Sequence, residues 1–256
     1  MRLEREISKM KARVRARRFV RWAICHGAAR AAGRRGAHVT KMPVAAALTC
    51  SAVMHGWAQP LPLTPSAWDI RYSDGPVHPS ASKEGWAIEF TRGLATPKPT
   101  QDCKCQGIGY VTTNWNEPIA GSSITMTFEI AATAGTVFGF KTERENTCAT
   151  PANFRLLIER KNDKLTEPSY RWWSNRVNYP LQSTNGLVSL TIPLSGDNWS
   201  DVYGVTGASD PTGFAAALAH AGPVGMTFGG GCFFGHGAYV TSGAATFVLK
   251  SYVINR

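Results

Sequence analysis

Alternation of apolar and polar residues, the pattern of half-buried β-strands, recurs along the chain from residue 68 onward. In the clearest run, Ile124, Met126, Phe128 and Ile130 alternate with polar side chains. This period, broken by turn residues, predicts strands over residues 68–72, 86–90, 108–113, 123–130, 136–141, 153–160, 169–175, 187–193, 224–228 and 245–254. The strands are short and lack intervening helices, which favours antiparallel sheets over repeated strand–helix units.

One segment, residues 211–220, has the features of a helix. Asp210 can cap its N-terminus, Pro211 suits its first turn, and Ala221-Gly222-Pro223 ends it. Nine or ten short strands with one short helix predict an all-β fold, a two-sheet antiparallel β-sandwich. A closed barrel is the alternative architecture.

A set of residues near the C-terminus resembles a known family. It consists of Trp199, Gly207, Pro211-Thr212-Gly213-Phe214, Ala217-Leu218, Val224–Phe228, Gly229-Gly230-Gly231, Gly235-His236-Gly237 and Gly243-Ala244-Ala245. The pattern resembles the C-terminal half of galactose-binding-like jelly-roll domains, a fold that includes many non-catalytic carbohydrate-binding modules. The resemblance is clear over residues 186–254 and rests on strand rhythm over 68–185. It implies the fold more than the ligand, because one fold hosts many functions.

Charge and composition divide the chain of 256 residues into a leader and one domain. Residues 1–58 contain 13 Lys or Arg and 2 Asp or Glu, whereas residues 59–256 contain 15 of each, so the net charge of +11 belongs to the leader. We therefore expect no nucleic-acid partner for the mature domain. Hydrophobic residues make up 43% of the chain, which excludes disorder of the whole. No apolar run reaches the roughly 18 residues of a membrane span.

The leader predicts export. Residues 1–41 are basic and rich in Arg and Ala, and residues 42–58 form a short apolar stretch that ends in small residues, as in a secretory signal. Translation starting at Met42, with residues 1–41 an over-extended reading frame, is one explanation of the long basic part. A basic tail that binds nucleic acid or anionic lipid is the other. We expect cleavage after Ala58, a Pro-rich lead-in over 59–67, a single sandwich domain over 68–256, and a secreted, periplasmic or cell-surface location.

Four cysteines of the expected mature chain, an even number, suggest up to two disulfides in an exported protein: Cys103, Cys105, Cys148 and Cys232. Because a bridge between residues two apart is strained, we expect Cys103 and Cys105 to pair with Cys148 and Cys232 in either combination. Free buried thiols or a metal site are the alternatives, and the spacing lacks the paired motifs of structural zinc.

The aromatic segment 169–175 carries the candidate binding surface. Alternation puts Arg171, Trp173 and Asn175 on the opposite face from Trp172. A flat indole beside Arg and Asn suits a sugar, whose apolar face stacks on the ring while the polar groups bind its hydroxyls.

Pairing of 153–160 with this segment as a hairpin would add Arg155 and Glu159 to the face of Trp173. We therefore predict an exported, non-catalytic domain that binds a carbohydrate or cell-surface glycan, with Trp173 as the platform. Trp115, in the polar loop 113–117, is a second candidate contact. The competing interpretation places Trp173 under a loop and makes the charges a solvated face.

Two other functions remain open. A glycoside hydrolase or polysaccharide lyase would use Glu129 and Glu159 as an acid/base pair, which needs two carboxyl groups roughly 5–10 Å apart. A structural or adhesive surface domain would have no small ligand.

The sequence predicts no cofactor, although Asp69, Asp74 or Asp201 with backbone carbonyls could hold a structural calcium ion. The Gly-rich segment 229–237 lacks the Lys-Ser/Thr of a phosphate loop, so its glycines indicate a tight strand connection. His236 within it is either structural or a ligand contact.

Overall fold

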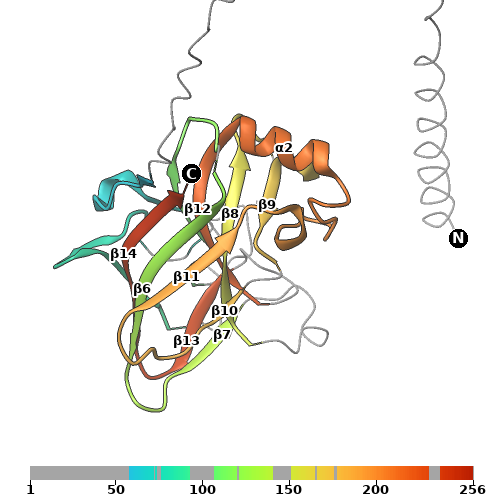
Figure 1. Cartoon of the computed structure of the whole chain (residues 1–256). Helices are drawn as coiled ribbons and strands as arrows, with labels where there is room; N and C mark the ends of the chain where they lie inside the picture. The colour runs from blue at the N-terminus through green and yellow to red at the C-terminus, as the bar shows by residue number, and fades with distance from the viewer. Residues whose placement is uncertain are drawn as a thin grey trace, which may run out of the picture. The chain divides into compact units, whose positions relative to one another are not determined.

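A computed structural model describes residues 58–71, 73, 76–92, 107–119, 121–140, 151–164, 166–175, 178–230 and 237–255. Within these residues, two antiparallel sheets face each other across a hydrophobic core, and one α-helix packs at the ends of strands β8 and β9 (Figure 1). The predicted β-sandwich is therefore confirmed. No described helix has the length and apolar character needed to cross a membrane.

The strands are short, as the alternation predicts. They are β1 (Gln59–Pro60), β2 (Asp69–Arg71), β3 (Ser80–Ser82), β4 (Gly85–Glu89), β5 (Tyr110–Asn114), β6 (Ser123–Ala132), β7 (Val137–Phe140), β8 (Asn153–Arg160), β9 (Arg171–Trp173), β10 (Tyr179–Pro180), β11 (Val188–Pro193), β12 (Ala221–Gly229), β13 (Ala238–Ser242) and β14 (Ala245–Asn255). The helical elements are η1 (Pro65–Ala67), η2 (Pro168–Tyr170), η3 (Gly196–Asn198) and α2 (Pro211–Ala219).

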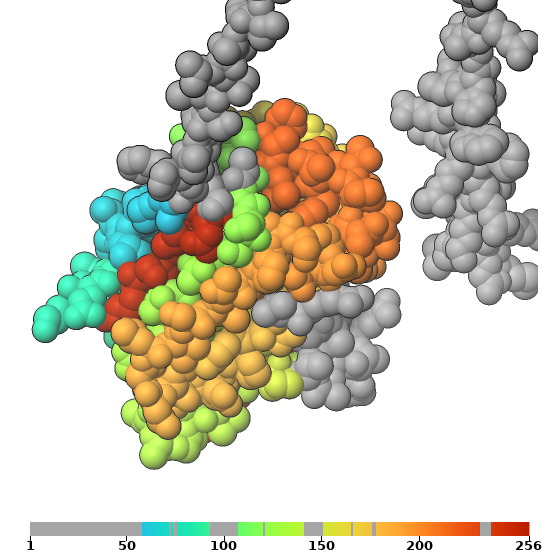
Figure 2. Space-filling model, in the orientation of Figure 1, coloured from blue at the N-terminus to red at the C-terminus, as the bar shows by residue number. Residues whose placement is uncertain are grey.

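Each sheet has six strands within the described residues. Sheet A has the order β11-β6-β14-β4-β3, with β1 also paired to β14; sheet B has the order β10-β8-β12-β5-β2, with β9 also paired to β8. Strands β7 and β13, which are distant in the sequence, form a separate antiparallel pair. Figure 2 shows the outer face of sheet A, where β14, β6 and β11 lie side by side.

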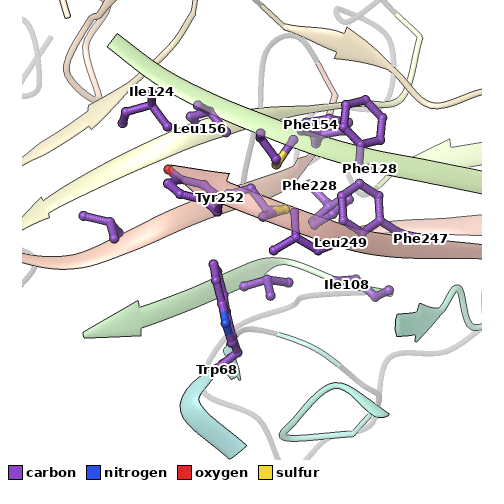
Figure 3. Packing of buried hydrophobic residues seen from close by; sticks show 14 of the residues in the cluster. Trp68, Ile108, Ile124, Phe128, Phe154, Leu156, Phe228, Phe247, Leu249 and Tyr252 are labelled. Atoms are coloured by element: carbon purple, nitrogen blue, oxygen red, sulfur yellow. The ribbon is translucent and has the colours of Figure 1, made fainter. Parts of the chain in front are cut away.

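Four phenylalanines, two from each sheet, meet in the centre of the core (Figure 3). Phe128 and Phe247 come from sheet A and stack with their ring centroids 5.4 Å apart; Phe154 and Phe228 come from sheet B, 5.6 Å apart. Phe154 meets Phe128 edge-on at 5.0 Å and Phe247 at 5.5 Å. We call these four residues the Phe cluster, and it joins the two sheets because every ring is fully buried.

A tyrosine also connects the two sheets through a hydrogen bond. Tyr252 of β14 is buried beside Trp68, and its hydroxyl donates to the carbonyl oxygen of Gly225 in β12 at 3.2 Å. Burial raises the pKa of the Tyr252 hydroxyl above its usual range, because the charged form would be desolvated. A side chain at Gly225 would place Cβ 2.1 Å from the Val111 carbonyl oxygen, so this junction requires glycine.

Helix α2 begins and ends as predicted. Asp210 accepts a hydrogen bond from the Gly213 N–H at 3.0 Å, which caps the N-terminus. Phe214 is buried between Trp172 and Trp199, with ring centroids 5.0 and 6.2 Å away, and fixes the helix against sheet B.

The structure adds strands that alternation does not predict. Strands β1, β3 and β10 have two or three residues, too few to show a period of two. Strand β12 begins at Ala221 rather than residue 224, with a register shift before Val224. The expected lead-in also joins the sandwich, since β1 pairs with β14 and Leu61 is buried.

We predict that Phe154→Ala lowers the free energy of unfolding by about 3–5 kcal/mol, because it removes a ring that contacts both sheets. Phe154→Leu, which refills part of the space, should cost less. Urea unfolding followed by tryptophan fluorescence measures the change. Val137→Ala, at a side chain that is 54% exposed, is the control and should change stability by less than about 0.5 kcal/mol. A Phe154→Ala cost near that of the control would contradict the role of the cluster.

We predict that Tyr252→Phe lowers stability by about 1–2 kcal/mol at pH 7, because the Gly225 carbonyl loses its donor. The hydroxyl has a raised pKa in the folded state, so its contribution is complete below the unfolded pKa of about 10 and falls as pH rises above it. Unfolding in urea at several pH values should therefore show the gap between the wild type and the variant narrowing above about pH 10. A gap that widens there would be inconsistent with this assignment.

Candidate functional site

The candidate binding residues lie on the outer face of sheet B. Leu157 of β8 stands opposite Trp173 of β9, and Glu159 stands opposite Arg171, so the predicted hairpin pairing and shared face are confirmed. Arg155 lies on the same face and pairs in register with Thr227 of β12. Two further strands extend this face beyond the residues that the sequence indicated.

Those strands contribute a row of polar and aromatic side chains. Thr227 stands opposite Tyr110 of β5, which stands opposite Arg71 of β2. The Arg71 guanidinium lies over the Tyr110 ring, 5.7 Å from its centroid. Sequence reasoning missed Arg71 and Tyr110 because their strands are separated from β8 by long stretches of chain.

The face is buried, which corrects the expectation that Trp173 forms an exposed platform. Trp173 is 1% exposed, and Arg155 and Glu159 are 4% and 5% exposed. Burial lowers the pKa of the Arg155 guanidinium to about 10, so the group stays charged at neutral pH. Trp173 is also fixed along its backbone, because it exchanges two hydrogen bonds with Ser200, each 2.9 Å long. A sugar ring cannot stack on an indole that is enclosed in this way.

An ion pair crosses the outer face of sheet B. Arg71 Nη2 lies 2.7 Å from Glu159 Oε2, although β5 and β12 separate their two strands. Thr112 and Gly225 stand opposite each other on the intervening strands. Because both residues are small, they leave room for the ion pair to pass over these strands. Glu159 is therefore occupied by Arg71, whose own side chain is 35% exposed.

Arg171 and Asn175, expected as polar sugar contacts, are held by other parts of the fold. The Nε of Arg171 lies 2.8 Å from Asp163 Oδ2, and the Asp163 side chain is fully buried. The Asn175 amide donates a hydrogen bond to the Ser200 hydroxyl. Both interactions fasten β9 to its neighbours.

Trp115 lies elsewhere. It follows β5 and packs partly buried against the core, where its backbone N–H donates to the Gly222 carbonyl at 2.9 Å. The expectation that Trp115 is an exposed loop residue is therefore wrong, because this loop folds back toward the C-terminal end of helix α2.

The two carboxylates of the enzyme alternative lie on opposite sides of the sandwich. Glu129 is on the outer face of sheet A, since Phe128 and Ile130 on either side of it point into the core. Glu159 is on the outer face of sheet B and is flanked by the inward-pointing Ile158. The core, about 10 Å thick between sheets, separates them, so they cannot act together on one glycosidic bond.

A short hairpin next to Trp173 exposes an aromatic ring that sequence reasoning missed. Ser200 pairs with Thr206, and Tyr203 at the tip between them is 79% exposed. The buried Asp201 carboxylate accepts the backbone N–H groups of Tyr203 and Val205 at 2.8 and 2.9 Å. The available signal was an apolar tip, Val202-Tyr203-Gly204-Val205, directly after an aspartate suited to fixing a turn.

Several expected site residues fall outside the described residues or serve other contacts. Cys103, Cys105, Cys148, Cys232, Asp74 and His236 lie outside the described residues. Two of the expected calcium ligands are described. Asp201 accepts backbone hydrogen bonds within the hairpin, and Asp69 Oδ1 lies 3.5 Å from His78 Nδ1. Within the described ranges, no three His, Cys, Asp or Glu side chains are grouped so as to hold a metal ion.

Among solved structures, the chain is similar to a protein described as a xylan-binding module CBM15. The sequence identity is 13% and the TM-score 0.40, and the match covers 78% of this chain and 96% of that chain. No protein-family model matches the chain, and no curated protein does either. The function therefore has to be inferred from the residues of the chain itself.

We predict that Glu159→Gln lowers the free energy of unfolding by about 1–3 kcal/mol, because Arg71 loses a charge-assisted hydrogen bond over a largely buried face. Urea unfolding measures the change. The matched control is Glu84→Gln, which breaks a 3.2 Å pair with Lys250 at a carboxylate that is 61% exposed, and should cost less than about 1 kcal/mol. Equal costs for the two variants would mean that the crossing ion pair does not fasten the sheet.

Proposed function

We propose that this protein is an exported, non-catalytic carbohydrate-binding domain and that Tyr203 is the ring on which the sugar stacks. The observation that carries the proposal is the rigid hairpin that holds Tyr203 in solvent. Tyr203 is 79% exposed, so most of its apolar ring surface faces water rather than the protein. The apolar face of a pyranose could cover this ring by stacking on it.

The hairpin supports this role because it is ordered before a ligand arrives. The Asp201 carboxylate, 6% exposed, fixes the backbone on both sides of the tip, and the Gly207 N–H donates to the Trp199 carbonyl at 2.9 Å. A platform that is already rigid loses little conformational entropy on binding. Val202 and Val205 in the same hairpin are 38% and 41% exposed, so the tip carries further apolar surface.

Tyr203, rather than the buried Trp173, is thus the proposed platform, and the ligand class is the one that the sequence predicts. Trp173 and Ser200 form the base of the hairpin through their paired backbones, and Asn175 holds the Ser200 hydroxyl. In this arrangement the buried polar face of sheet B supports the platform from beneath rather than contacting the sugar. The two-sheet β-sandwich is the architecture that the sequence resemblance to galactose-binding-like modules implied, which is in keeping with the proposal.

Export rests on the leader. A basic segment followed by a short apolar stretch ending in small residues is typical of a secretory signal, and the four remaining cysteines suit an oxidising compartment. The glycans that such a domain would meet are extracellular or part of a cell wall.

The test is affinity electrophoresis of the full chain through gels containing a neutral β-glucan, a xylan or a polyuronate. We predict that at least one polysaccharide retards the protein, and that Tyr203→Ala weakens binding about tenfold or more while Tyr203→Phe retains it. If the sugar were held by the Tyr203 hydroxyl rather than by stacking on the ring, Tyr203→Phe would weaken binding as much as Tyr203→Ala does.

Leu187→Ala is the matched control, because Leu187 is 58% exposed at a different turn. It should migrate as the wild type does in every gel. If Tyr203→Ala were retarded as strongly as the wild type, Tyr203 would not be part of the binding site. The absence of retardation in all gels would contradict carbohydrate binding and favour an adhesive domain whose hairpin tip contacts another protein.

A further inference from the structure

A concave site lies at one end of the sandwich, and none of its lining residues belongs to the Tyr203 hairpin. It is a groove of about 430 Å³ formed where the loop after β5, the turn after β8 and the C-terminal end of α2 meet. This volume lies within the range of small-molecule sites, about 300–1,000 Å³. Nothing in the proposed stacking of a sugar on Tyr203 uses it.

The groove is held open by the backbone. The Lys161 N–H donates to the His220 carbonyl and the Ile119 N–H to the Leu218 carbonyl, both at 2.8 Å, so all three segments are tied together. Asn116, in the loop after β5, and Asn162, in the turn after β8, both line the groove and have φ angles of 60° and 62°. They are the non-glycine residues of positive φ among the described residues, and this conformation turns both segments sharply at the rim.

Three charged side chains line the groove without an ion-pair partner among the described residues: Arg160, Lys161 and Glu117. The Arg160 guanidinium is pre-oriented, because it lies over the Tyr170 ring at 4.4 Å from the centroid. Two cations on adjacent residues favour an anionic group, and the carboxylate and two amides can accept from or donate to hydroxyls. The single carboxylate disfavours a polyanion.

We propose that this groove binds an acidic monosaccharide unit, a sugar ring that carries one carboxylate. The ligand carboxylate lies against Arg160 and Lys161. Its hydroxyls bind Glu117 and the amides of Asn116 and Asn162. The predominantly polar lining suits a hydroxylated ligand better than an apolar one.

The probe is sodium glucuronate added to the full chain, followed by chemical-shift changes in two-dimensional NMR spectra. We expect saturable binding with a dissociation constant on the order of 1 mM, since one ring makes few contacts. Glucose, which lacks the charge, and acetate, which lacks the hydroxyls, should each bind at least about tenfold more weakly.

Lys161→Gln should weaken glucuronate binding about tenfold, and Lys164→Gln is the matched control because this nearby exposed lysine does not line the groove. Asn162→Gly keeps the positive φ and removes only the amide, so it should weaken binding without unfolding the turn. Tyr203→Ala should leave glucuronate binding unchanged, which separates this site from the platform.

Each alternative result overturns the proposal. Equal binding of glucose would remove the role of the cations, and equal binding of acetate would reduce the groove to a general anion site. Equal weakening by Lys161→Gln and Lys164→Gln would place the ligand elsewhere, and an absence of shifts up to about 50 mM glucuronate would show that the groove has no such ligand.

Discussion

The structure depends on the aromatic contact between its two sheets. Phe128 and Phe247 of sheet A contact Phe154 and Phe228 of sheet B, so the inner face of each sheet is buried in the core. Once these faces are buried, the outward side of every strand is determined, because side chains alternate strictly. The placement of Glu129, Glu159 and Trp173 follows from this one constraint rather than from any preference of their own.

The two outer faces are chemically different. On sheet A, Thr125 pairs with Thr191 and Thr127 with Ser189 through exposed hydroxyls, each pair 2.9 Å apart. On sheet B the face is charged and almost closed to solvent. Burying charges is unfavourable unless they are paired. The ion pair on this face therefore connects strands of the sheet and is not available to bind a ligand. Surfaces for recognition are therefore left to the turns and strand ends.

Alternation was enough to predict the sandwich, the hairpin of β8 and β9 and the shared face of Arg155, Glu159 and Trp173. It reports only which side of a strand a residue occupies, so it could not reveal that this side is covered. It also could not assign Glu129 to one sheet and Glu159 to the other. The exposure of Tyr203 depends on the hydrogen bonds that backbone N–H groups donate to the Asp201 carboxylate. The end groove depends on three segments that are distant in the sequence, and neither feature leaves a periodic signal.

The pairing of β1 with β14 brings the two ends of the domain together. Gln59 stands opposite Ile254, so the domain begins and ends at neighbouring points. Just after β1, Leu61 is buried and its N–H donates to the Tyr252 carbonyl oxygen at 2.8 Å. Cleavage after Ala58 would therefore leave the new N-terminus held against the last strand, beside the residue whose hydroxyl connects the two sheets.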